Sequence, residues 1–190
     1  MNKHLEEVIE EVRNTRVVKV FLSSTFRDMQ MERDKLLTDA FVRLREECSE
    51  RGIIWNEIDL RWGVTQEQVD NFEVLPICFS EIENSLPFFI GILGNRYGWV
   101  PDENGEPKQL EQIAQKYDWL NTYKRRSVTE LEFLHGAILN QNPHALFYFK
   151  DAKAAASLPE EIQLDAVENE EWRKTQLADL KRLIRNDFEK

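Results

Sequence analysis

The chain has 190 residues, a formal net charge of −10 and 11% aromatic residues. This length and aromatic content predict one packed globular domain with extensions, and the acidic balance argues against general electrostatic binding of nucleic acid. The N-terminal residues lack the apolar stretch of a signal peptide, and no run reaches the roughly 18 apolar residues that a membrane span needs. We therefore expect a soluble, cytoplasmic protein.

The first part of the chain predicts a strand, a loop and a long helix in direct succession. An acidic helical arm over residues 3–13 precedes a β-branched strand at Val17–Leu22, and a helix with apolar residues at helical spacing follows over Asp28–Arg51. The loop between strand and helix consists of Ser23, Ser24, Thr25, Phe26 and Arg27. Backbone amides, small hydroxyls and a nearby helix N-terminus favour negative charge, so this loop is a candidate anion site.

The rest of the chain continues to alternate strands and helices. The next expected elements are a strand at Ile53–Leu60, a turn-rich loop at Arg61–Asn71, a helix at Val74–Ser85, a strand at Phe88–Leu93 and a loop at Gly94–Trp99. They are followed by an insertion over residues 102–126 with one helical stretch, a helix at Ser127–Leu139, a strand at Ala145–Phe149 and a polar helix from about Glu170. This alternation predicts an α/β fold with a parallel sheet and helices on both faces.

Three segments differ in character along the chain. We expect an N-terminal helical arm over residues 1–15, the α/β domain over residues 16–151, and a C-terminal helical extension over residues 152–190 that leads toward a further module. In a parallel sheet the loops that follow the strands share one edge. The candidate ligand site should therefore lie where those loops meet.

The helix expected over Ser127–Leu139 carries two glutamates that a helical projection separates. At about 100° per residue, Glu130 falls in the arc of the apolar side chains, whereas Glu132 falls on the opposite, solvated side. A carboxylate within an apolar stripe needs a partner or a cavity. Glu130 is therefore either a structural carboxylate that offsets the helix dipole or pairs with Arg96 or Arg126, or a functional one at the floor of a crevice.

Two strand-end loops place arginine beside aromatic residues. The candidate binding residues in these loops are Asp59, Arg61, Trp62, Arg96 and Tyr97. Asp59 suits a structural salt bridge with Arg27 or Arg61. The alternative is a polar rim that receives a ribose or a phosphate, with Trp62 stacking on the ligand or plugging the site.

Motifs for several common chemistries are absent. The sequence contains neither GxxxxGK[ST] nor GxGxxG, so it has no motif for a P-loop or for a Rossmann dinucleotide-binding site. It also lacks GxSxG, and its scattered histidines do not have the spacing of metal ligands. We expect no metal site, and we expect Cys48 and Cys78 to be buried free thiols.

Four segments, in order, resemble the TIR-like domain of unknown function that typically precedes NACHT or other STAND-type nucleotide-binding modules and repeat arrays. They read VFLSSTFRDMQMERD, DLRWGVT, FFIGILGNRYGWVP and SVTELEF, and the resemblance covers about residues 16–150. The resemblance implies a flavodoxin-like sheet of about five strands. It also implies a place in intracellular sensors of innate immunity, including antiphage defence systems.

The resemblance further implies roles for individual segments. Arg61–Asn71 would match the BB loop, which TIR domains use in assembly and substrate access. Glu130 would match the glutamate with which enzymatic TIR domains cleave NAD, with Glu132 as the alternate. Enzymatic members often carry Trp-Cys a few residues before that glutamate, whereas this chain has Arg126–Thr129.

Two functions follow from the residues and the resemblance together. One is a signalling module that binds copies of itself or other TIR-like domains when a downstream nucleotide-binding module oligomerises. The alternative is an NAD nucleosidase or a related nucleotide N-glycosidase that needs no cofactor. In the alternative, Glu130 stabilises the oxocarbenium-like ribose, Phe26 or Trp62 holds the nicotinamide, and Arg27 with the amides of Ser23–Thr25 binds the pyrophosphate.

Overall fold

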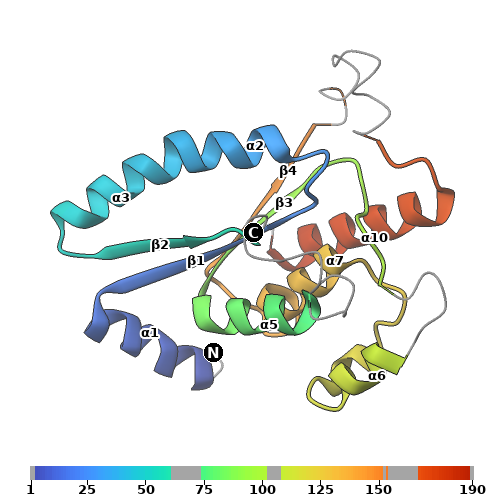
Figure 1. The fold of residues 1–190 in the computed structure, drawn as a ribbon, viewed down its shortest axis with the longest axis horizontal. Coiled ribbons are helices and arrows are strands. Elements are labelled where there is room, and N and C mark those ends of the chain that lie inside the picture. Colours follow the sequence, from blue (N-terminus) through green and yellow to red (C-terminus); the bar gives the residue numbers. More distant parts are fainter. Residues whose placement is uncertain (1–2, 61–73, 102–107, 152, 154–166, 189–190) are drawn as a thin grey trace.

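Four parallel strands form the centre of the fold, in the order β2-β1-β3-β4 (Figure 1). In this computed structural model they span Val17–Ser24 (β1), Ile54–Ile58 (β2), Phe88–Leu93 (β3) and Ala145–Phe149 (β4). The order is that of a flavodoxin-like sheet, in which the second strand lies outside the first. The predicted parallel α/β fold is confirmed, with four strands in the described part of the chain rather than about five.

The structure describes residues 3–60, 74–101, 108–151, 153 and 167–188. Its α-helices are Lys3–Thr15 (α1), Gln30–Lys35 (α2), Phe41–Glu50 (α3), Val74–Ser85 (α5), Lys108–Ala114 (α6), Val128–Phe133 (α7) and Glu171–Phe188 (α10). Two π-helical turns, Leu36–Ala40 and Leu134–Ile138, continue α2 into α3 and lengthen α7, and Asp118–Asn121 forms a 3-10 turn after α6. The elements expected at Val74–Ser85, Phe88–Leu93 and Ala145–Phe149 are confirmed with the same bounds.

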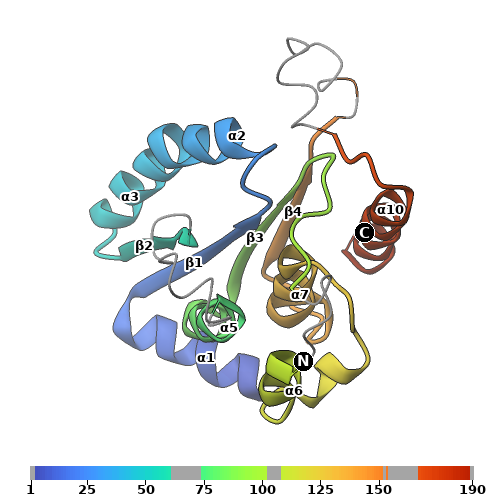
Figure 2. The ribbon, with the colours of Figure 1, turned by 45° about the vertical axis from the view of Figure 1, so that its right-hand side comes forward.

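Helices cover both faces of the sheet because the side chains of each strand alternate between them (Figure 2). On one face, Leu22 and Ile92 pack with Met29 and Phe41 beneath α2 and α3. On the other face, Phe21 stacks on Phe89 at 5.9 Å, within a larger core to which α5, α7 and α10 contribute. The sheet is thus a buried layer, and its strand ends are the places where polar groups can gather.

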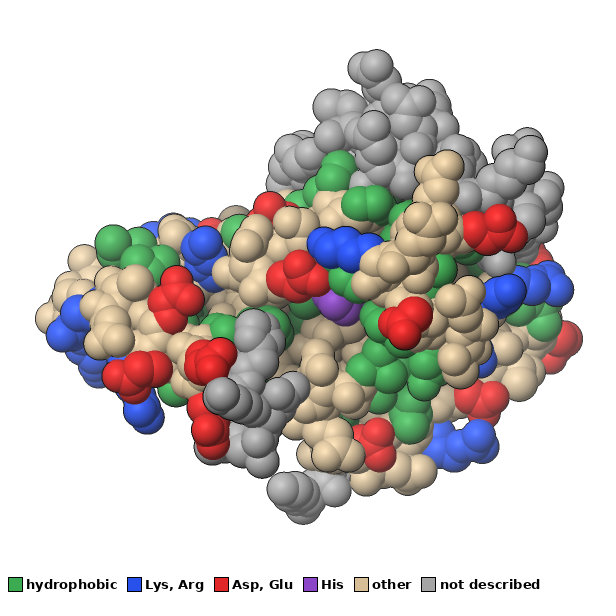
Figure 3. Space-filling model, turned by 90° about the horizontal axis from the view of Figure 1, so that it is seen from below, with side chains coloured by type: hydrophobic (Ala, Val, Ile, Leu, Met, Phe, Trp, Pro, Cys, Tyr) green, Lys and Arg blue, Asp and Glu red, His purple; other side chains and the backbone are tan. Residues whose placement is uncertain are grey.

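The C-terminal helix α10 packs on the same face as α7. Its buried residues are Leu177, Leu180 and Ile184, and Phe188 meets Phe147 of β4 with the ring centroids 4.9 Å apart. Among the described residues no helix has both the length and the apolar character needed to cross a membrane. Figure 3 shows acidic and basic side chains interspersed with apolar ones over the face seen from below.

Candidate functional site

The carboxyl ends of β1 and β3 lie side by side where the strand order reverses. Open α/β sheets form their ligand crevices outside this switch point. Ser23 pairs in register with Gly91, and Ser24 with Ile92. Ser23, Ser24 and the following Thr25 are all buried, so the predicted loop does begin at the switch point.

Ser24 is held there by a buried arginine that the sequence analysis missed. Arg33 of α2 is only 1% exposed and donates from Nη1 to Ser24 Oγ at 2.7 Å and from Nη2 to the Leu22 carbonyl oxygen at 3.0 Å. The same guanidinium forms a buried ion pair with Asp59 just after β2. Asp59 thus forms the kind of salt bridge expected of it, with Arg33, which was not among its expected partners.

Glu132 lies in the protein interior, which corrects the prediction of a solvated bystander. It is 7% exposed and accepts a hydrogen bond from the Ser23 hydroxyl. Burial raises the pKa of Glu132, opposed by the hydrogen bonds from Ser23 and Cys78 and by the charge of Arg33. Burial and the neighbouring Glu132 likewise raise the pKa of the Cys78 thiol, so the protonated thiol is favoured.

The projection failed because residues Thr129 to Phe133 of α7 are all buried. The helix lies between α5 and the end of β1, with no solvated side over this turn. A helical projection with a single apolar stripe therefore does not predict which side chains of α7 are buried.

Glu130 is also buried, and two other predicted residues hold it. Its carboxylate accepts a hydrogen bond from the Tyr97 hydroxyl and lies 3.5 Å from Nη1 of Arg126. Its own backbone amide donates to the Ser127 side chain at 3.2 Å, so Ser127 is the N-cap of α7. Burial raises the pKa of Glu130, while Tyr97 and Arg126 oppose the rise. Burial and the adjoining Glu130 also raise the pKa of Tyr97.

A third acidic side chain, Asp28, lies at the switch point itself. Its Oδ2 accepts hydrogen bonds from the backbone amides of Asn95 at 2.9 Å and Arg96 at 3.2 Å, just after β3. Thr25 donates to its other oxygen. A Cβ on Gly94 would collide with this carboxylate, so glycine permits the close approach. Burial raises the pKa of Asp28, against these hydrogen bonds. The carboxylate of Asp28 thus occupies the two backbone amides that follow β3.

The remaining predicted residues lie at the margin of these groups. Phe26 is 53% exposed and lies over the Arg33 guanidinium, whose central carbon is 5.2 Å from the ring centroid. Arg27 is exposed and Arg96 is half-buried. Arg61 and Trp62, with the BB-like loop at Arg61–Asn71, lie outside the described residues.

The predicted residues therefore form three hydrogen-bonded groups. Ser23 joins Glu132, Ser24 joins Asp59 through Arg33, and Tyr97 joins Glu130. Chemically, each glutamate can retain a proton or balance a nearby positive charge. No cluster of three or more potential metal ligands occurs among the residues that the structure describes.

Residues 19–188 match the profile of a family described as a domain of unknown function, DUF4062. The chain belongs to this family. Because the match extends to residue 188, the DUF4062 domain includes the C-terminal helix α10.

Several curated proteins contain a DUF4062-like segment similar to this chain. A TPR repeat-containing protein of Dictyostelium discoideum is 37% identical over 161 residues, which is 80% of this chain and 9% of that protein. Telomerase protein component 1 of Mus musculus is 34% identical over 179 residues, 92% of this chain and 7% of that protein. NACHT and WD repeat domain-containing protein 2 of Homo sapiens is 37% identical over 106 residues, 52% of this chain and 6% of that protein.

The chain spans less than a tenth of the length of each of these three relatives. The segment similar to this chain is thus a small part of much larger proteins, one of which is named for its NACHT and WD repeat modules. No solved structure matches the chain significantly.

Two residues that organise the DUF4062 switch point were missed at the sequence level. Arg33 lies four residues before Leu37, within the apolar stripe of the first long helix, and an arginine in such a stripe indicates a buried ion pair. For Asp28 the sequence offers no comparable signal, because its partners are backbone amides far along the chain.

Proposed function

We propose that this DUF4062 domain is a TIR-like signalling module that acts by oligomerisation-dependent protein interaction, within a larger NACHT- or STAND-type sensor. The similarity to parts of NACHT and WD repeat proteins supports the sensor context. Intracellular defence signalling, including antiphage defence, belongs to the same proposal and rests on the TIR-like sequence pattern.

The proposal is supported mainly by the hydrogen bonds and the ion pair that polar groups form with one another at the carboxyl edge of the sheet. Asp28 caps the amides after β3, Glu130 is held by Tyr97 and Arg126, and Glu132 is bonded to Ser23. Because these groups satisfy one another's hydrogen-bonding capacity, they hold the backbone of the edge loops in place. A rigid edge suits protein recognition, because little conformational entropy is lost on binding.

Two aromatic side chains project from this rigid edge. Phe26 follows β1 and is 53% exposed, and Trp99 follows β3 and is 45% exposed. Their loops are neighbours, since a Cβ on Gly98 would lie 3.1 Å from Thr25 Cγ2. Exposed aromatics on a well-ordered surface are typical anchors of protein interfaces. We assign the self-association surface to these two loops.

Sedimentation velocity of the 190-residue chain over a concentration series tests this assignment. We expect the average mass to rise with concentration, and we expect Phe26→Ala and Trp99→Ala each to suppress that rise. Ile54→Ala is the matched control, because Ile54 is equally exposed, at 58%, but lies at the start of the edge strand β2. An equal effect of all three variants, or a wild-type chain that stays monomeric throughout, would contradict the proposal.

The second candidate function is cleavage of NAD or a related nucleotide at its N-glycosidic bond. The observation that favours it is Glu130 itself, a buried carboxyl with a raised pKa beside the Tyr97 hydroxyl. Perturbed carboxyls of this kind are common in catalytic sites. In such a reaction the Glu130 carboxylate would stabilise positive charge on the ribose.

Release of nicotinamide from NAD by clustered protein tests this second function. The alternative predicts turnover that Glu130→Gln abolishes. Turnover that survives Glu130→Gln but not Glu132→Gln would assign the chemistry to Glu132 instead. If protein that self-associates normally releases no nicotinamide above background, NAD cleavage is excluded and the interaction module is the remaining function.

A further inference from the structure

The C-terminal helix α10 contacts both ends of the loop Gly94–Trp99, which follows β3 and is called the Trp99 loop below. Lys181 donates from Nζ to the Gly94 carbonyl oxygen at 2.6 Å. Arg173 donates from Nη1 to the Gly98 carbonyl oxygen at 3.3 Å. Because these two cations lie about two turns apart on one helix, α10 spans the loop and holds its backbone at both ends.

The residues just before α10 hold the middle of the Trp99 loop. The backbone amide of Glu168 donates to the Asn95 carbonyl oxygen at 2.8 Å, and Val167 forms a parallel bridge with the same residue. The Glu168 side chain is buried, and its Oε2 accepts a hydrogen bond from the Tyr97 amide at 3.2 Å. Hydrogen bonds to a buried carboxylate are strong, so this part of the loop is fixed as well.

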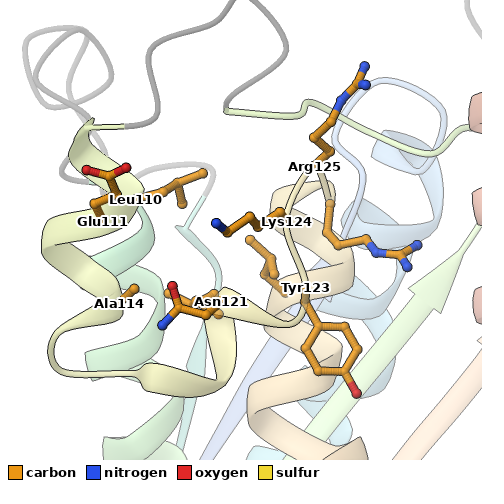
Figure 4. Close-up of a pocket in the computed structure, with 10 residues that line it drawn as sticks. Leu110, Glu111, Ala114, Asn121, Tyr123, Lys124 and Arg125 are labelled. Carbon is orange, nitrogen blue, oxygen red and sulfur yellow. The ribbon is translucent and has the colours of Figure 1, made fainter.

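Trp172, in the first turn of α10, connects the Trp99 loop to the chain that leads into α7. Its ring meets the Tyr97 ring edge-on at 6.1 Å, and the Arg125 guanidinium lies over it at 5.6 Å. Figure 4 shows the Arg125 side chain directed away from α6. Since the Tyr97 hydroxyl donates to Glu130, the start of α10 also contacts the residue that holds this glutamate.

The Trp99 loop therefore lies between two sets of partners. Asp28 binds the amides of Asn95 and Arg96 from the side of β1, and the segment Val167–Lys181 binds the loop from the side of α10. We propose that the segment Val167–Lys181 positions Trp99 for self-association and so couples α10 to that surface. The role of Trp99 rests on the proposed function, whereas the effect on the loop does not. A shift of α10 would change how Trp99 is presented.

Hydrogen–deuterium exchange of the 190-residue chain tests the positioning of the loop. The double variant Arg173→Met/Lys181→Met removes both side-chain donors to the loop. We expect the amides of residues 95–99 to exchange faster by about tenfold, because local opening becomes easier. The amides of β3, Phe88–Leu93, should exchange as in the wild type. Unchanged exchange in the loop, or equal acceleration in β3, would overturn the proposal.

The matched control is Lys174→Met/Arg182→Met, which removes the same charge from the same helix. These two cations pair with Glu171 and Asp179 of α10 itself, so loop exchange should equal that of the wild type. Lys181→Arg keeps a cationic donor near Gly94 and should also retain slow exchange. An equal effect of the control, or fast exchange in Lys181→Arg, would show that the bond to the loop is not the cause.

Sedimentation velocity of the same proteins tests the coupling to self-association. The dissociation constant of Arg173→Met/Lys181→Met should rise about fivefold or more, as expected when an aromatic anchor is no longer held in place, whereas the control should match the wild type. A wild-type dissociation constant together with fast loop exchange would overturn the coupling. A wild-type chain that stays monomeric would refute the proposed function, and loop exchange would still decide whether α10 positions the loop.

Discussion

Replacement of Arg33 by methionine should destabilise this domain far more than an ordinary arginine substitution would. The side chain is 1% exposed and its partner Asp59 is 6% exposed. Methionine fills part of the space but leaves the Asp59 carboxylate without its guanidinium, and it also removes the hydrogen bonds to Ser24 and Leu22. Removal of one partner of a buried pair costs about 3–5 kcal/mol.

The chain contains a matched control for this substitution. Arg45 and Glu57 form a second arginine–carboxylate pair between α3 and β2, but these side chains are 48% and 18% exposed. Solvent screening reduces the contribution of such a pair to about 0–1 kcal/mol. We therefore expect Arg45→Met to lower the free energy of unfolding only slightly.

Urea denaturation followed by circular dichroism measures both effects. The double variant Arg33→Met/Asp59→Asn should be more stable than the sum of its two single variants predicts, by about 2 kcal/mol, as is usual for residues in contact. If Arg33→Met costs no more than Arg45→Met, or if the two changes at Arg33 and Asp59 are additive, the buried ion pair does not stabilise the switch point.

Three further predictions concern the helix α7 and its surroundings. Burial raises the pKa of Glu132 above its usual 4.5, so the wild-type domain is most stable below pH 4.5 and loses stability as the pH rises from there through the folded-state pKa of Glu132. Glu132→Gln removes this titration and should therefore gain stability relative to the wild type by up to about 1.4 kcal/mol per pH unit across that window. Equal urea midpoints of the two proteins at all pH values would disprove this. Gly136→Ala should lower the unfolding free energy by about 1–3 kcal/mol, because the new Cβ would collide with the Phe89 ring; unchanged thermal unfolding would show that the ring can move. Ser127→Ala removes the helix cap and should cost about 1 kcal/mol, a loss that calorimetry would detect.

The sequence predicted the layers of the fold well because local patterns determine them. Alternating strand and helix patterns produced the parallel sheet, and the apolar strand at Phe88–Leu93 was placed with its observed bounds. The fifth strand came from the resemblance rather than from the residues, and the described part of the chain contains four. The long helix expected over Asp28–Arg51 begins at Gln30 and includes a π-helical turn, which helical spacing alone does not reveal.

The candidate site was predicted less well because it depends on contacts between distant segments. Glu130 pairs with Arg126, one of its two expected partners, but the contacts of Ser23 with Glu132 and of Ser24 with Arg33 were not predicted. Glu132 was assigned to solvent because a helical projection assumes one buried side, whereas α7 is buried around residues 129–133. The contact of Asp28 with the amides after β3 was not predicted, because only the fold brings these two segments together.

We propose above that Phe26 and Trp99 at the carboxyl edge of the sheet mediate self-association. The most direct test is the dissociation constant of the self-associated form, measured for the wild type and for Phe26→Ala/Trp99→Ala. Loss of two aromatic anchors at an interface should raise this constant at least tenfold, since each anchor contributes more than about 1 kcal/mol. The unfolding free energy should stay nearly the same, because both side chains are exposed. A dissociation constant equal to that of the wild type would contradict the claim.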